Sequence, residues 1–229
     1  MHVHHRINTT LACANEIHAS SGWRSKSYSA VYHNIIHYGV PKYYLHRGNM
    51  GNSGNYRWYA IRVTYNREIK VKQRLDAKHI ENFLPMKYRV VMRGERRIKE
   101  LVPAIHNLIF VYMTTEGMKE FKQTTDLPIR YIMDKETNTP LTIPERQMKS
   151  FIAVAGTRDE QLMYLDSCPA NISKGDKVRV TGGIFEGAEG YFLRIKGDRR
   201  VVVNIKGVAA VATAFIHPSL IEKIYDEQQ

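Results

Sequence analysis

The sequence predicts an α+β fold, in which a domain of sheet and helices is followed by a small all-β domain. Residues 58–65 alternate with period two, so that Tyr59, Ile61 and Val63 share one face of a strand. The stretch that follows, 67–83, contains neither Gly nor Pro and predicts a helix. Nearer the C-terminus, three short alternating runs between 177 and 205 are separated by glycine turns, which is typical of a small β-barrel.

The first helix carries a stripe of positive charge. We expect it to begin after Asn66, an N-cap residue, and to turn Val71 and Leu75 toward the sheet. Cations spaced three or four residues apart form the basic stripe, which consists of Arg67, Lys70, Arg74 and Lys78. Such a stripe indicates either contact with nucleic-acid phosphates or a solvated helix face.

A hairpin is predicted next. Residues 87–102 hold two β-prone runs around the turn Arg93-Gly94-Glu95. Its tip is basic because it carries Arg93, Arg96 and Arg97. Beside a basic helix, this hairpin is either a second phosphate contact, which gives affinity without base reading, or a soluble surface loop.

The remaining elements complete the first domain. Residues 105–113 are largely apolar, which predicts a central strand buried on both faces. A short helix capped by Thr114 or Thr115, a strand at 129–133 and a helix begun by Pro144-Glu145 follow. Strand, helix, hairpin, strand, helix, strand and helix in that order make a compact α+β domain.

Composition narrows the class of protein. The net charge of +12 favours partners that are polyanions. Cys13 and Cys168 belong to no C-x-x-C pattern, so neither a zinc site nor a disulfide framework is indicated. Because no apolar run approaches the ~18 residues that span a membrane, we expect a cytoplasmic protein without a membrane partner. His79, His106 and His217 lack a nucleophile or metal spacing around them, so we predict no enzyme and no cofactor.

The first 55 residues differ from the rest. They contain seven of the ten histidines, many Ser and Asn, and little periodicity. We interpret residues 1–55 as an N-terminal extension without a fold of its own. No histidine pair there shares one helical face with a carboxylate or cysteine that would help to hold a metal, and Met50 is an alternative natural start.

Both predicted domains resemble one family. The segment from Lys174 to Ile205 resembles a KOW motif, which implies the SH3-like barrel of ribosomal proteins and NusG-type elongation factors. Upstream, several pieces resemble a NusG N-terminal (NGN) domain in order and spacing: Trp58-Tyr59, Leu84-Pro85-Met86, the hairpin tip 93–97, the strand 106–111, and 140–144. The Pro-Met step, the Arg-Gly-x-Arg tip and the run 183–187 resemble the specialised paralogs of the RfaH and UpxY type more than housekeeping NusG. We therefore expect an NGN domain at 56–155, a linker at 156–173 that leaves the domains free to act separately, and a KOW domain at 174–229.

The resemblance implies a non-catalytic mechanism. An NGN domain docks on the clamp helices of the largest RNA polymerase subunit and suppresses pausing or termination, in some paralogs at specific operons such as capsule loci. By motif position the polymerase contact falls on Ile105, His106, Asn107 and Leu108, with Phe121 as a neighbour. Contact with non-template DNA or nascent RNA falls on Lys70, Arg74 and Lys78. Phe185, at the barrel tip, matches the position by which NusG engages ribosomal protein or Rho.

Two alternatives stay open. A ribosome-associated KOW protein that binds RNA would explain the C-terminal motif alone. In addition, residues 209–214 (Ala-Ala-Val-Ala-Thr-Ala) suit strand or helix, so RfaH-like fold switching is a hypothesis. NMR shifts that report the same β structure in the isolated domain and the full chain would reject it.

Overall fold

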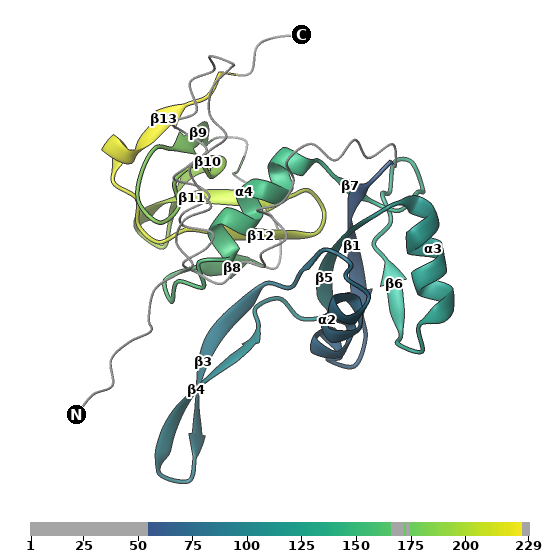
Figure 1. The fold of residues 1–229 in the computed structure, drawn as a ribbon. Helices are drawn as coiled ribbons and strands as arrows, with labels where there is room; N and C mark the ends of the chain where they lie inside the picture. Colours follow the sequence, from purple (N-terminus) through teal and green to yellow (C-terminus); the bar gives the residue numbers. More distant parts are fainter. Residues whose placement is uncertain (1–54, 166–171, 173–174, 226–229) are drawn as a thin grey trace, which may run out of the picture.

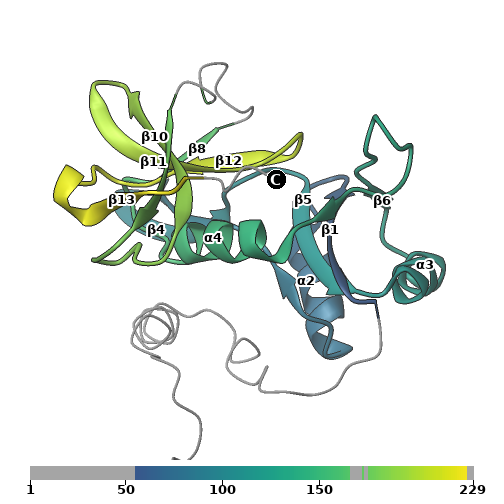
Figure 2. The ribbon, with the colours of Figure 1, turned by 90° about the horizontal axis from the view of Figure 1, so that it is seen from above.

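Two sheet-containing parts pack on either side of one helix, α4 (Glu145–Ala155), in the computed structural model, which describes residues 55–165, 172 and 175–225. Figure 1 shows the N-terminal sheet with helices α2 and α3 on one side and the C-terminal strands on the other. In Figure 2, seen from above, α4 lies between β1 and β5 and the C-terminal sheet. The predicted N-terminal extension, its histidines and Met50 lie outside the described residues.

The N-terminal sheet is antiparallel and follows the order β2-β5-β1-β6, with β7 also paired to β1. Its strands are β1 (Arg57–Val63), β2 (Asn82–Phe83), β5 (Leu108–Met113), β6 (Ile129–Tyr131) and β7 (Thr142–Ile143). The helices that cover it are α2 (Glu68–Ala77) and α3 (Thr115–Thr124). The prediction of a central strand is confirmed, because β5 lies between β2 and β1 and is almost wholly buried.

The predicted alternation in β1 is also confirmed. Tyr59, Ile61 and Val63 pack into the core beneath α2 and α3. Trp58 and Ala60 point to the other face, where they join the core around α4. One strand of alternating side chains thus contributes to two cores, one on each side of the sheet.

Helix α2 is shorter at both ends than the sequence predicted. Tyr65 and Asn66 have left-handed backbone conformations, with φ of +61° and +52°, so the helix begins after Arg67 and Asn66 is not its N-cap. At the other end His79, with φ of +54°, turns the chain out of the helix. Residues 82–83, predicted as helical, form β2 instead because their backbone pairs with β5.

The predicted hairpin is confirmed as β3 (Met86–Arg93) and β4 (Arg96–Pro103), which pair along their whole length. It projects from the body of the protein (Figure 1). Helix α3 is capped as expected, since the Oγ1 of Thr114 accepts a hydrogen bond from the backbone N–H of Gly117 at 3.0 Å.

The C-terminal part is a six-stranded antiparallel sheet of order β13-β9-β10-β11-β12-β8. Its strands are β8 (Met163–Leu165), β9 (Asp176–Val180), β10 (Glu189–Ile195), β11 (Asp198–Ile205), β12 (Ala209–Ala212) and β13 (Ile221–Lys223), with a 3₁₀ turn at Pro218–Leu220. Residues 209–212 are a strand here, flanked by β11 and β8. The sheet is consistent with a KOW-type β domain.

The linker prediction needs correction in two respects. Part of the predicted linker, Met163–Leu165, is strand β8, which pairs with β12. The two parts are also not separate, because one hydrophobic cluster runs from Trp58 and Phe110 through Phe151 of α4 to Val201 of β11. Helix α4 buries apolar side chains toward both sheets, and a helix that is apolar on more than one face belongs between two layers.

Candidate functional site

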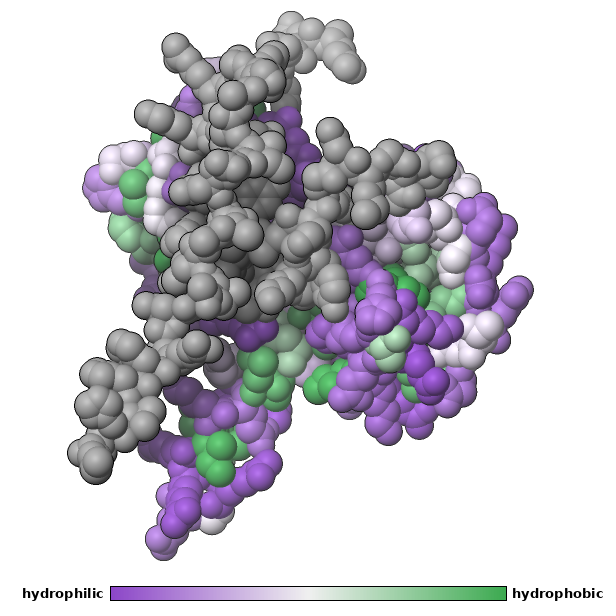
Figure 3. Space-filling view, viewed as in Figure 1, coloured by the Kyte–Doolittle hydropathy of each residue, from purple (hydrophilic) through white to green (hydrophobic). Residues whose placement is uncertain are grey.

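The basic stripe of α2 lies on the surface. Arg67, Lys70, Arg74 and Lys78 are all exposed, with Arg67 and Lys78 as the residues that flank the helix. Arg74 pairs with Asp126 at 3.3 Å, and Lys78 approaches the hydroxyl of Thr124 at 3.5 Å. Both partners are near the C-terminal end of α3, so the second half of the stripe lies beside that end of α3. Hydrophilic residues dominate the surface around these helices in Figure 3.

An open cleft continues this surface beyond the end of α2. It has a volume of about 530 Å³ and is bordered by Lys78 and His79. One wall is aromatic, because the rings of Tyr56 and Tyr112 stack with centroids 5.5 Å apart. Positive charge next to aromatic rings suits unpaired nucleotides, which bind through both phosphate and base.

The arginines of the hairpin tip lie on two faces. Arg93 and Arg96 are directly opposite each other across the turn, where Gly94 has φ of +60°. Arg97 is opposite Met92 and therefore points to the other face. Arg93 also binds Glu100 at 2.7 Å. The tip thus presents positive charge on both sides of a two-stranded ribbon.

The predicted polymerase loop is held by a carboxylate that the sequence analysis missed. Asn107 has φ of +59°, and its backbone N–H donates to Glu68 Oε1 at 2.5 Å. Its carbonyl oxygen accepts from the N–H of Val63 at 3.0 Å. Glu68 is 1% exposed and is the first residue of α2. The loop is therefore fixed to both β1 and the N-terminus of the basic helix.

The five residues predicted at the polymerase contact do not form one patch. His106 is exposed and Ile105 is half-buried, whereas Leu108 is buried in the core around α4. Phe121 is also buried, but in the other core, beneath α3. The loop adjoins the start of α2, and Phe121 adjoins Lys78 just past its end. These ends are about 15 Å apart in a ten-residue helix, so Phe121 is not a neighbour of the loop.

Phe185 is covered rather than displayed. It is 5% exposed and belongs to the cluster that contains Phe151 and Ile152 of α4. Phe185 is thus part of the shared core in this arrangement, and the structure does not present it as an exposed partner contact.

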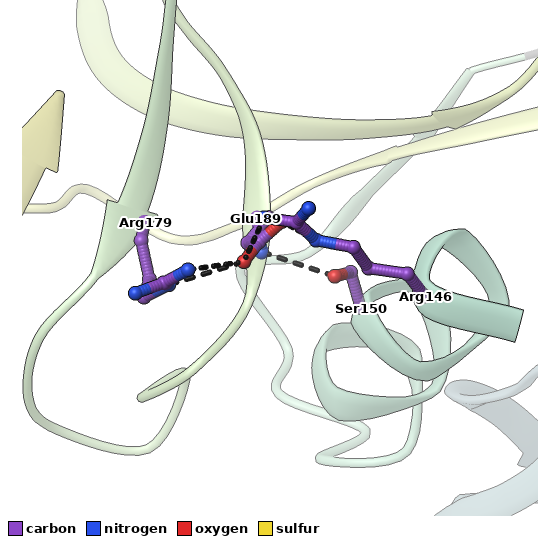
Figure 4. A network of polar contacts seen from close by, with 4 residues as sticks. All are labelled: Arg146, Ser150, Arg179 and Glu189. Atoms are coloured by element: carbon purple, nitrogen blue, oxygen red, sulfur yellow. Dashed lines mark hydrogen bonds and ion pairs between the residues drawn. The ribbon is translucent and has the colours of Figure 1, made fainter. Parts of the chain in front are cut away.

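A polar network holds α4 against the same sheet (Figure 4). Arg146 of α4 donates to both carboxylate oxygens of Glu189 at 2.6 and 3.0 Å, and Arg179 of β9 donates to Oε1 at 2.9 Å. The N–H of Glu189 donates to Ser150 Oγ at 3.1 Å. Burial alone would raise the pKa of Glu189, but the two guanidinium groups outweigh it and lower the pKa. Nearby, Gln147 donates to the carbonyl oxygen of Asn204 at 2.7 Å.

Comparison with known proteins decides the nature of the first domain. The NusG family model, described as "Transcription termination factor nusG", matches residues 56–152. Residues 56–152 are therefore similar to a NusG N-terminal domain. The match agrees with the predicted NGN domain and with a non-enzymatic transcription factor. It does not distinguish the specialised RfaH and UpxY types from other NusG proteins, so that finer assignment stays a prediction.

One solved structure similar to the chain is titled "Domain interaction in Thermotoga maritima NusG". The identity is 21%, the match covers 74% of this chain and 98% of that one, and the TM-score is 0.35. A search of curated proteins found no match.

Metal-binding clusters and membrane-spanning helices are both absent from the residues that the structure describes. No group of three or more His, Cys, Asp or Glu side chains there could hold a metal ion. None of the helices in those residues is long and apolar enough to cross a membrane.

Proposed function

We propose that the protein is a transcription elongation factor that binds RNA polymerase through its NusG-type domain and suppresses pausing or termination. The observation that carries this proposal is the match of residues 56–152 to the NusG family. The exposed basic stripe and the anchored loop at 105–108 support it, because they offer one surface for nucleic acid and another for protein.

The polymerase contact is proposed at the loop, with His106 and Ile105 touching the clamp helices of the largest subunit. Asn107 and Leu108 then support the loop without touching the polymerase. Asn107 fixes the turn, and Leu108 packs in the core. Phe121 supports α3 in this proposal and does not touch the polymerase, because it is buried elsewhere.

The nucleic-acid contact is proposed along α2, through Arg67, Lys70, Arg74 and Lys78, and at the hairpin tip. Non-template DNA or nascent RNA is the ligand, because an elongation complex exposes both as single strands. Binding through phosphates predicts a strong dependence on salt. Replacing Lys70 by Gln should weaken binding to a single-stranded oligonucleotide and reduce the slope of log K against log salt by about 0.7. Lys72→Gln is the matched control, because Lys72 is engaged by Asp76 at 2.9 Å.

Two finer points belong to the same proposal. Service at particular operons, such as capsule polysaccharide loci, rests on the resemblance of the hairpin tip and of residues 183–187 to the specialised paralogs. A contact of Phe185 with ribosomal protein or Rho requires the side chain to become exposed first, since it is buried in the shared core.

Affinity capture from cells tests the proposal directly. The full-length protein should recover RNA polymerase subunits, and in a purified system it should shorten pauses or increase read-through of a terminator. Recovery of ribosomes without polymerase would instead favour the ribosome-associated alternative. If neither is recovered and transcription is unchanged, both proposals are wrong.

A further inference from the structure

Two arginines face each other across neighbouring strands of the N-terminal sheet. Arg62 of β1 is directly opposite Arg130 of β6 in the antiparallel register. On its other side, Arg62 is paired with Leu108 of β5. Side chains that are directly opposite share one face of the sheet, with Cβ atoms about 5 Å apart. The two arginines therefore project from the same face of the sheet, next to the start of β5.

This pair has no acidic partner among the residues that the structure describes. Both side chains are exposed, and neither takes part in an ion pair there. Other arginines do have such partners, as Arg74 has Asp126 and Arg146 has Glu189. Like charges directly opposite on a sheet destabilise it, so the fold bears a cost that no described residue offsets. An anion from outside the chain would offset that cost through charge-assisted hydrogen bonds.

The position of the pair indicates whether its anion belongs to a protein or to a nucleic acid. Arg62 lies on the face of β1 that carries Trp58 and Ala60, opposite to the face that α2 covers. The basic stripe of α2 therefore belongs to the other side of the sheet. The loop with the half-buried Ile105 and the exposed His106 leads directly into Leu108, the partner of Arg62 in β5. Arginine next to apolar side chains is typical of protein interfaces, whereas a nucleic-acid path would follow the run of cations on α2.

We propose that Arg62 and Arg130 together bind acidic side chains of a protein partner, as an extension of the contact made by the loop at 105–108. The partner surface must then carry at least one carboxylate next to the point where His106 docks. This inference rests on the proposed function, and it adds the chemistry that the polymerase surface has to offer. Each guanidinium can hold a carboxylate with two parallel hydrogen bonds.

The arginine pair supports binding but lowers the stability of the fold. Replacing either arginine by Gln removes the repulsion between them, so the variant should be at least as stable as the wild type. Arg130→Glu goes further, because it places a carboxylate opposite Arg62 and so fills the anion site from within. That variant should fold well and bind worst.

The experiment measures binding of the full-length protein to purified RNA polymerase at several salt concentrations. We expect Arg62→Gln and Arg130→Gln each to weaken binding about tenfold at low salt, with no fall in melting temperature. Arg199→Gln, an exposed arginine of the C-terminal sheet, is the matched control and should bind as the wild type does.

Each contrary result has a separate meaning. If the wild type binds polymerase and both Gln variants bind equally well, the inference is wrong and the proposed function stands. If the variants lose affinity for a single-stranded oligonucleotide but keep it for polymerase, the site binds phosphate and the inference is wrong as well. If the wild type itself does not bind polymerase, the proposed function fails and this inference fails with it.

Discussion

Arg146 of helix α4 donates hydrogen bonds to both carboxylate oxygens of Glu189, a residue 43 positions further along the chain. The two belong to different sheet-containing parts, so this bidentate pair connects the NusG-type domain to the C-terminal sheet. Arg179 donates to the same carboxylate, and the Oγ of Ser150 accepts a hydrogen bond from the backbone N–H of Glu189. Glu189 is therefore the centre of the polar contact between the parts.

Glu189→Gln should loosen this contact. The amide keeps the size of the side chain but loses the charge-assisted bonds to two guanidinium groups, so the free energy of unfolding should fall by about 1–2 kcal/mol. Urea denaturation measures it, with Glu186→Gln on the neighbouring loop as the control that should change stability by less than about 0.5 kcal/mol. Equal effects of the two substitutions would contradict a special role for Glu189.

The same residue predicts a pH dependence. The folded protein lowers the pKa of Glu189 below its ordinary value of 4.5, so the carboxylate stabilises the fold fully above that value. This stabilisation should be lost as the pH falls from 4.5 through the lower pKa of the folded state. The quantity to measure is the difference in unfolding free energy between wild type and Glu189→Gln from pH 7 to 3. It should shrink on the acid side, and a difference that stays constant would contradict the assignment.

Glu68→Ala should destabilise the first domain and disturb the loop. It leaves the partly buried N–H of Asn107 without its acceptor, which costs about 1–3 kcal/mol. Glu68→Gln keeps an acceptor oxygen and should cost less. Denaturation gives the stability of both variants, and affinity for RNA polymerase should fall more for Ala than for Gln. Polymerase affinity that is unchanged in Glu68→Ala would show that the loop does not need this anchor.

Gly190→Ala tests the packing of the C-terminal sheet. A Cβ atom at this position would clash with the carbonyl oxygen of Val202 and lie 2.9 Å from Val201 Cγ1. Both neighbours belong to the paired strand β11 and cannot move freely, so the substitution should cost about 2–3 kcal/mol. Gly182→Ala is the control, because its Cβ would make only an ordinary contact of 3.4 Å with Leu220. Similar melting temperatures for the two variants would contradict this packing.

Local patterns predicted much of the fold. The alternation in β1 could be predicted because its inward side chains belong to one of two cores. The Thr114 cap could be predicted because it acts within one turn of the chain. The C-terminal end of α2 could not be predicted from the sequence. The helix ends because the backbone of His79 is left-handed. Strand β2 forms only because β5, far away in the sequence, pairs with it.

The candidate site also has parts that local patterns predicted and parts that they could not predict. The cations of α2 and of the hairpin tip were found from their spacing, which the helix and the ribbon preserve. The anchor between Glu68 and Asn107 joins residues 39 positions apart, and no spacing rule reaches that far. Burial of Leu108, Phe121 and Phe185 also depends on which layer covers each of them, and this is decided by the packing of α3 and α4.

Strand β8 affects where the chain can be cut. It comes from the segment between the two parts, yet it pairs with β12 along Met163–Leu165. A C-terminal fragment that starts at residue 174 would lack it and expose the β12 backbone as an open edge, which invites pairing with other chains. A fragment that starts near Arg158 keeps this edge covered. The segment between the parts is thus a protective strand of the C-terminal sheet as well as a connection.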